Sequence, residues 1–106
     1  MKEVVIYEDE NGNRPYEKWF QKLKDNRAKY RIVVRLAQVA EGYFGDVKSV
    51  GQGVKELRFF FGPGYRIYFA EKGNTIVLLL CGGDKGSQRR DIKLAQTYWQ
   101  EYQDRD

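Results

Sequence analysis

The chain has 106 residues, of which 42% are apolar and 15% aromatic. This length suits a single domain, residues 1–106, and the apolar content suffices for a packed core. No apolar run approaches the roughly 18 residues that span a bilayer, and the first ten residues lack the apolar segment of a signal peptide. We therefore expect a cytoplasmic protein without membrane contact. The absence of histidine excludes Ser-His-Asp and Cys-His catalysis, and the single cysteine, Cys81, excludes an internal disulfide.

The net charge of +4 is concentrated in one segment. Residues 14–35 hold eight basic and two acidic residues, whereas residues 1–13 hold one basic and four acidic residues. Such a segment is typical of a surface that binds a polyanion, and equally of a lysine-rich helix face exposed to water. Charge alone does not separate these two interpretations.

The first half of the chain predicts a strand followed by two helices. Residues 2–7 are rich in β-branched side chains and predict a strand. A helix then starts at Asn13 or Arg14, with Pro15 in its first turn, and ends before Asp25. A second helix is predicted over about residues 27–44. Both carry an apolar stripe at helical spacing, so together they predict a basic helical hairpin.

The second half predicts three strands and a final helix. A glycine-rich loop over residues 45–53 precedes strands at residues 54–61, 65–71 and 75–81, which are joined by short turns. The last strand is apolar throughout, which indicates a central strand covered on both faces. Ser87 is a suitable N-cap for the final helix. The order β-α-α-β-β-β-α predicts an α+β fold, an antiparallel sheet with the helices packed on one face.

The candidate chemistry lies on the second predicted hairpin. A connecting loop with an odd number of residues pairs Arg58 with Arg66 and Glu56 with Tyr68, whereas a two-residue turn would force charge toward the core. We therefore expect these four side chains on one open sheet face, with Lys85 reaching them from the corner after the last strand.

Two cationic groups beside a carboxylate form a plausible site for a phosphodiester, because guanidinium groups bind phosphate oxygens and a glutamate could accept a proton from a ribose hydroxyl. Cross-strand Glu–Arg pairs are also common on exposed sheet faces without any catalytic role. Pattern alone leaves both interpretations open.

Other candidate sites carry weaker signals. Three scattered carboxylates, Glu56, Asp84 and Asp91, are a poor metal signal, and the glycines form no nucleotide-binding motif, so we expect no metal and no cofactor. The segment 59–61 is three consecutive phenylalanines near a hairpin tip, so at least one ring must be exposed. An exposed ring there would suit a protein partner.

Two strings carry a family resemblance. GVKELRFFFGPGYRIYF and LLLCGGDKGSQRRDIKLAQTYW resemble the RelE/HigB-type toxins of bacterial type II toxin–antitoxin modules, in particular the subgroup of probable addiction-module killer proteins described as phage-derived and Gp49-like. The resemblance implies the compact RelE-like fold. It also implies an antitoxin partner, usually a small helix-turn-helix protein, and a ribosome-dependent endoribonuclease activity in which the ribose 2′-OH of mRNA attacks the adjacent phosphate without a metal.

The resemblance also implies roles for individual residues. Arg66 would stabilise the scissile phosphate, Glu56 would act as general base, and Lys85 takes the place of the basic residue after the last strand. Residues expected to contact RNA, from the open face and the basic hairpin, are Arg58, Tyr68, Lys22, Lys24, Arg31 and Arg35.

This chain departs from RelE in having Val54 and Glu56 where RelE carries lysines, and it has no clear match to the C-terminal tyrosine of several ribonuclease members. The alternatives are a non-catalytic toxin of ParE type, which shares the fold and inhibits DNA gyrase, and an inactive relative.

Overall fold

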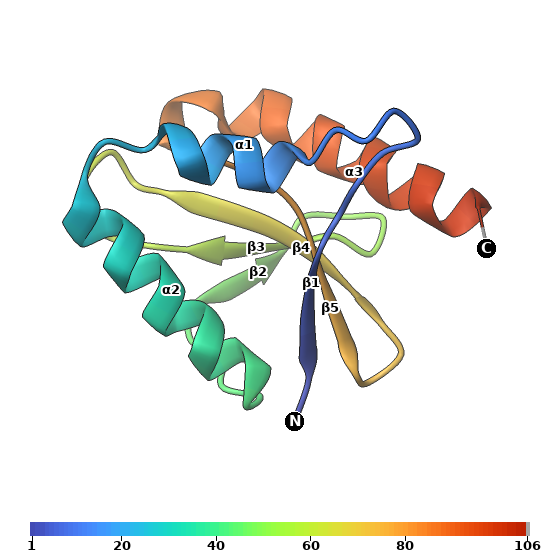
Figure 1. Ribbon diagram of the computed structural model, residues 1–106, viewed down its shortest axis with the longest axis horizontal. Coiled ribbons are helices and arrows are strands. Elements are labelled where there is room, and N and C mark those ends of the chain that lie inside the picture. Colours follow the sequence, from blue (N-terminus) through green and yellow to red (C-terminus); the bar gives the residue numbers. More distant parts are fainter. Residues whose placement is uncertain (106) are drawn as a thin grey trace.

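The computed structural model describes residues 1–105 and follows the predicted order of elements, with one additional strand (Figure 1). The elements are β1 (Glu3–Ile6), α1 (Pro15–Lys22), α2 (Asn26–Ala40), β2 (Val47–Ser49), β3 (Lys55–Arg58), β4 (Arg66–Lys72), β5 (Ile76–Gly83), the 3-10 turn η1 (Lys85–Ser87) and α3 (Gln88–Asp104). Strand β2 lies inside the segment predicted as a loop. Its three residues are too few to show an alternating pattern in the sequence.

The five strands form one mixed sheet in the order β1-β5-β4-β3-β2. Strand β5 lies inside the sheet, between β1 and β4, and is almost entirely buried, as its apolar sequence predicts. The prediction of an antiparallel sheet is confirmed for β2 to β5 but wrong for β1, which pairs with β5 in parallel. Two helices and three strands separate β1 from β5, so no tight turn dictates their relative direction.

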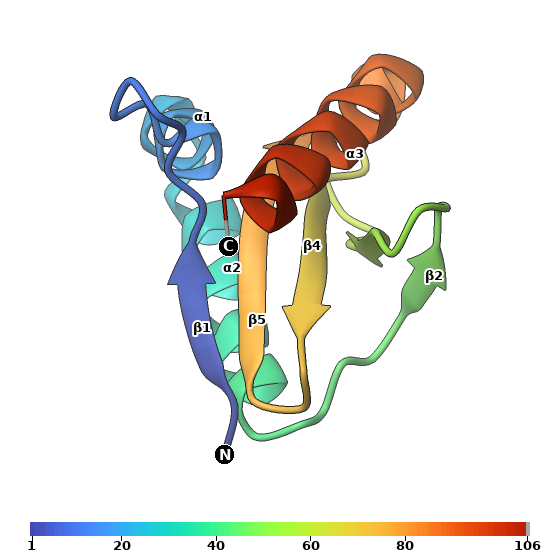
Figure 2. The ribbon, with the colours of Figure 1, turned by 90° about the vertical axis from the view of Figure 1, so that its right-hand side faces the viewer.

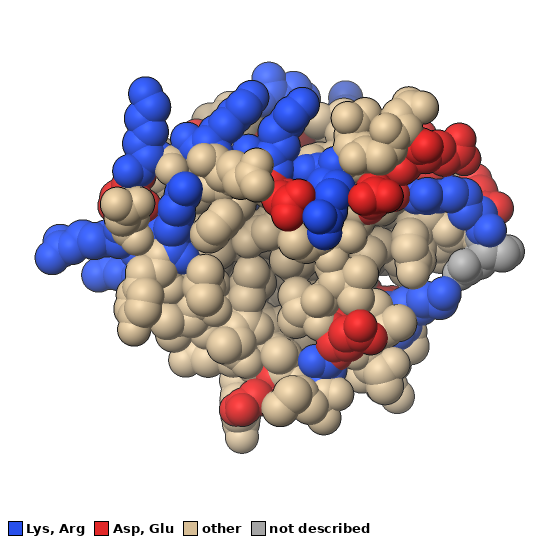
Figure 3. All heavy atoms as spheres, viewed as in Figure 1, with Lys and Arg blue, Asp and Glu red and all other residues tan. Residues whose placement is uncertain are grey.

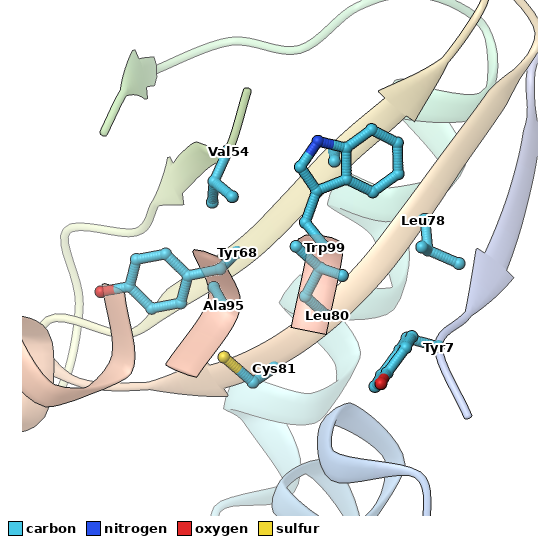
Figure 4. Packing of buried hydrophobic residues seen from close by; sticks show 9 residues of the cluster. Tyr7, Val54, Tyr68, Leu78, Leu80, Cys81, Ala95 and Trp99 are labelled. Carbon is cyan, nitrogen blue, oxygen red and sulfur yellow. The ribbon is translucent and has the colours of Figure 1, made fainter. Parts of the chain in front are cut away.

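The helices cover both faces of the sheet, so the prediction of one covered face is wrong (Figure 2). Helices α1 and α2 pack on one face, where Ile32, Leu57 and Phe69 belong to one apolar cluster. Helix α3 packs on the other, and Figure 4 shows its residues Ala95 and Trp99 within the second cluster. The fold class, α+β, is confirmed.

Two boundaries differ from the sequence-based prediction for local reasons. Helix α2 ends at Ala40 rather than near residue 44, because Gly42 adopts a φ of +94°, which a continuing helix does not allow. Strand β5 extends through Gly82 and Gly83, beyond the predicted end at residue 81. A Cβ atom at Gly82 would collide with the ring of Trp19, so this glycine allows α1 to approach the sheet.

Candidate functional site

The register of the β3–β4 hairpin is the predicted one. Arg58 lies opposite Arg66 and Glu56 lies opposite Tyr68, so the four side chains share one face. The prediction that this face is open to solvent is wrong. Glu56 and Tyr68 are completely buried and Arg66 is only 7% exposed. Helix α3 covers this face, with its first residue, Gln88, in contact with Glu56. The prediction treated an acidic and a basic residue on a strand as solvent-facing, whereas here the polar groups satisfy one another.

The carboxylate of Glu56 is the centre of this buried polar group. Its Oε2 accepts hydrogen bonds from the hydroxyl of Tyr68 at 3.0 Å and from Nε2 of Gln88 at 2.7 Å. Its Oε1 is buried and has no hydrogen-bond partner within residues 1–105. Burial, reinforced by the charge of Glu56, raises the pKa of Tyr68 far above its usual value, so the hydroxyl stays protonated and donates.

Arg66 is held from two sides. Its Nε lies 3.8 Å from Oε2 of Glu56, and its Nη1 donates to the carbonyls of Gly64 at 3.1 Å and Tyr65 at 3.3 Å. The Nε is buried and donates no hydrogen bond within residues 1–105. The guanidinium is therefore fixed in place by a charge and two carbonyls, with one buried donor left unused.

A hollow of about 380 Å³ opens over Arg66 at the tip of the hairpin, and it is lined by Phe59, Phe60, Gly62, Pro63, Gly64, Arg66 and Lys85. Lys85 is exposed, and its backbone N–H donates to the carbonyl of Pro63 at 3.4 Å. A Cβ atom at Gly64 would stand 3.4 Å from Cβ of Lys85 and 3.5 Å from Nη1 of Arg66. The structure thus brings together the predicted pair Arg66 and Lys85.

Arg58 stands beside this hollow with its charge already paired. Its Nε and Nη2 donate to the two carboxylate oxygens of Asp46 at 3.0 and 3.1 Å, and this bidentate contact raises the pKa of Arg58. Its guanidinium lies 5.6 Å from the ring centre of Phe60. Arg58 therefore helps to hold Asp46 and Phe60 in place, and its charge is already paired.

The four predicted RNA-binding residues of the helical hairpin fall into two groups. Lys22, Lys24 and Arg31 are exposed, and Arg31 stacks over the ring of Phe61 at 4.8 Å. Arg35 is half-buried, and its guanidinium donates four hydrogen bonds of 2.8 to 3.1 Å to the backbone carbonyls of Phe44, Asp46 and Arg58.

Many of the basic residues lie at one end of the molecule. The end of α1, the start of α2, the β3–β4 tip and the start of α3 meet at the left in Figure 1, and Lys and Arg side chains project from that part of Figure 3. Arg89, Arg90 and Lys93 of α3 line a further hollow of about 470 Å³. At the opposite end, Tyr7 donates to Glu101 and Arg105 donates to the carbonyl of Glu8, which joins two acidic segments.

Sequence reasoning missed two residues of this site. Gln88 caps Glu56, and Asp46 neutralises Arg58 from the loop before β2. Gln88 lies within the second string that carries the family resemblance, but nothing in that string indicates its contact with Glu56, and Asp46 lies in the segment predicted as a loop; each acts through a contact made only when distant segments meet. Within residues 1–105, no three His, Cys, Asp or Glu side chains lie together so as to hold a metal ion, and no helix is both long and apolar enough to cross a membrane.

Comparison with known proteins places the chain in a family. Residues 18–101 match the family model "Phage derived protein Gp49-like (DUF891)". The chain is also 46% identical over 86 residues to a protein of Haemophilus influenzae described as uncharacterized, a match that covers 81% of this chain and 87% of the relative. The chain belongs to the Gp49-like family of phage-derived proteins, a family associated with toxin–antitoxin modules.

Proposed function

We propose that this protein is the toxin of a type II toxin–antitoxin module and that it arrests translation by cleaving mRNA on the ribosome. The observation that supports this proposal is Arg66, whose guanidinium is held by Glu56 and two backbone carbonyls and lines a hollow that also exposes Lys85. A guanidinium and an ammonium beside one another suit a phosphodiester. The hollow lies at the basic end of the molecule, where an RNA strand would be attracted.

The reaction proposed is an internal transfer at phosphorus. The ribose 2′-oxygen gives its proton to solvent water and bonds to the adjacent phosphorus, the bond from phosphorus to the 5′-oxygen breaks, and that oxygen takes up a proton. The products are a 2′,3′-cyclic phosphate and a 5′-hydroxyl. Negative charge grows on the non-bridging oxygens in the transition state, and Arg66 stabilises it from a fixed position. Lys85, the exposed cation of the hollow, supplies the proton to the leaving oxygen.

Glu56 has a different role from the general base suggested by the family resemblance. A group that takes a proton from RNA must reach it, and Glu56 is completely buried beneath Gln88. We assign it instead to positioning: its carboxylate lies 3.8 Å from Nε of Arg66 and orients the guanidinium toward the hollow. The hydroxyl of Tyr68 donates a hydrogen bond to the same carboxylate and helps to hold it in place.

The experiment is controlled expression in bacteria with parallel mapping of mRNA ends. Arg66→Ala also leaves the buried Glu56 without its counter-charge, so it is compared with the wild type at matched soluble expression; it should abolish growth arrest and slow cleavage by roughly 100- to 1000-fold, because it removes transition-state stabilisation. Arg66→Lys should restore little, since an ammonium lacks the planar fork. The matched control is Arg105→Ala, which removes an arginine at the opposite end of the molecule and should leave cleavage unchanged. If Arg66→Ala cuts mRNA at the wild-type rate, the proposed site is wrong.

An antitoxin partner follows from membership of a toxin–antitoxin family. We place its contact on the outer face of α2, where Tyr30, Val33 and Val34 are 71%, 55% and 40% exposed. Side chains at this spacing form one apolar stripe that water solvates poorly. The product of an adjacent small reading frame should co-purify with the protein, and Val33→Glu should weaken that complex while leaving mRNA cleavage intact.

The same apolar stripe favours the second candidate function, a toxin that acts by binding a protein target such as gyrase. The two candidates differ in the outcome of one comparison. A binding toxin arrests DNA synthesis, leaves mRNA uncut, and keeps its effect when Arg66 is replaced. A nuclease loses its effect with Arg66.

A further inference from the structure

The ring of Phe60 is an unusual surface feature beside Arg66. It is 78% exposed, although its neighbour Phe59 is buried and belongs to the core. Phe60 lines the 380 Å³ hollow together with Arg66 and Lys85. A volume of this size falls within the range of about 300–1,000 Å³ that is typical of small-molecule pockets. The lining of the hollow thus combines aromatic rings with two cationic side chains.

This combination matches the two halves of a nucleotide. A phosphate requires cationic donors, which Arg66 and Lys85 supply. A base requires a flat apolar surface, because stacking on an aromatic ring removes both faces from water. The guanidinium of Arg58 lies over the Phe60 ring at 5.6 Å and is itself fixed by Asp46, so the ring is supported by a fixed cation.

We propose that the hollow is a subsite for one nucleotide of single-stranded RNA, with the base stacked on Phe60 and the adjoining phosphate on Arg66 and Lys85. This inference rests on the proposed function and names the part of its substrate that the hollow receives. Stacking needs no hydrogen-bond pattern, so Phe60 contributes affinity for any of the four bases and does not select among them.

The test compares two six-unit strands by NMR titration at low salt. One is a 2′-O-methyl RNA, which lacks the attacking hydroxyl and remains uncut. The other is an abasic strand of the same backbone and charge. Phe60→Ala should weaken binding of the RNA by about 10-fold, within the range expected for one stacked base, and leave binding of the abasic strand unchanged. Lys85→Gln should weaken binding of both strands, because both retain the phosphates.

Two further variants separate stacking from general damage. Phe60→Trp should bind the RNA at least as tightly as the wild type, since it keeps an aromatic ring. Tyr43→Ala removes a ring that is 71% exposed outside the hollow and should change neither affinity. All of these positions are exposed, so each variant is expected to keep the fold.

The outcomes also distinguish this inference from the proposed function. If Phe60→Ala binds both strands as the wild type does, or if the wild type binds neither, the subsite is wrong even where mRNA is cut on the ribosome. If Phe60→Ala instead weakens only the antitoxin complex, the ring is a protein anchor and the inference is overturned. If the RNA-specific loss is seen but the wild type cuts no mRNA, the subsite stands and the nuclease proposal fails.

Discussion

Replacing Glu56 by glutamine should destabilise the fold strongly, because it leaves the buried Arg66 without its counter-charge. The two charges lie 3.8 Å apart and are 0% and 8% exposed. At that separation two unit charges interact by about 4 kcal/mol at an effective dielectric constant near 20, and breaking a buried pair from one side costs about 3–5 kcal/mol. Glutamine keeps the shape and can still accept from Tyr68, so the loss of charge dominates. We expect a loss of about 3–4 kcal/mol in the free energy of unfolding.

The assay is urea denaturation followed by the fluorescence of Trp19 and Trp99, which lie on opposite sides of the sheet. The control is Glu71→Gln. Glu71 has closer partners, Lys2 at 3.2 Å and Lys55 at 3.0 Å, but its side chain is 22% exposed. A partly solvated pair should lose only about 1 kcal/mol, so the longer but buried contact should matter more.

A double variant completes this argument. Glu56→Leu combined with Arg66→Leu removes both charges, and it should be far less destabilised than the sum of the two single changes. If Glu56→Gln lies within about 0.5 kcal/mol of the wild type, or is no more harmful than Glu71→Gln, the reasoning from burial is refuted.

Three further predictions follow from the same contacts. Replacing Lys22, Lys24 and Arg31 together by glutamine should leave the melting temperature unchanged, since all three are exposed. The slope of log affinity for the ribosome against log salt concentration, measured by co-sedimentation, should become shallower by about two. An unchanged slope would contradict their role in docking. Arg35→Gln should cost about 2–3 kcal/mol in urea denaturation, because it strips donors from the carbonyls of Phe44, Asp46 and Arg58, and Arg35→Lys should not restore it; stability within error of the wild type would show that these contacts are dispensable. Burial first, and the charge of Asp91 second, raises the pKa of Cys81 from 9.0 to about 12, so the folded state favours the protonated thiol. The stabilisation from this group is complete below about pH 9 and falls above it, by about 1.4 kcal/mol per pH unit. Cys81→Ala should therefore delay the fall in melting temperature between about pH 9 and 10.

The hairpin register could be predicted from the sequence because a one-residue slip has a large cost. Pairing Leu57 with Ile67 keeps both in the core, and any shift by one would exchange them with Glu56 and Arg58. That argument fixes which residues share a face. It does not say what covers the face, and there the prediction failed.

The position of α3 could have been predicted from the sequence. A central strand that is apolar on both faces needs cover on both, and the stripe of Ile92, Ala95 and Trp99 on the last helix supplies it. Placing every helix on one face leaves half of β5 in water. Recognising this conflict would also have predicted that Glu56 and Tyr68 are buried.

The role of Arg35 could not be predicted in the same way. On a helix, Arg31 and Arg35 have the same residue type and the same basic surroundings, yet one is exposed and the other is anchored. What separates them is whether backbone carbonyls from a remote segment come within reach. Those carbonyls belong to Phe44, Asp46 and Arg58, whose position depends on the loop before β2 and the end of β3. No local sequence pattern indicates where those carbonyls lie relative to α2.

The separation of charge along the molecule gives it an electric axis. Its acidic segments meet where Tyr7 and Arg105 join Glu101 and Glu8, while most of the Lys and Arg side chains seen in Figure 3 project nearer the other end. In the field of an RNA-covered particle such a body experiences a torque as well as an attraction, and it turns its cationic end forward before contact. Fewer collisions are then wasted on unproductive orientations. Ions screen this field over about 8 Å at physiological ionic strength, so the field raises the association rate constant. Added salt should lower that rate constant more strongly than it raises the dissociation rate constant.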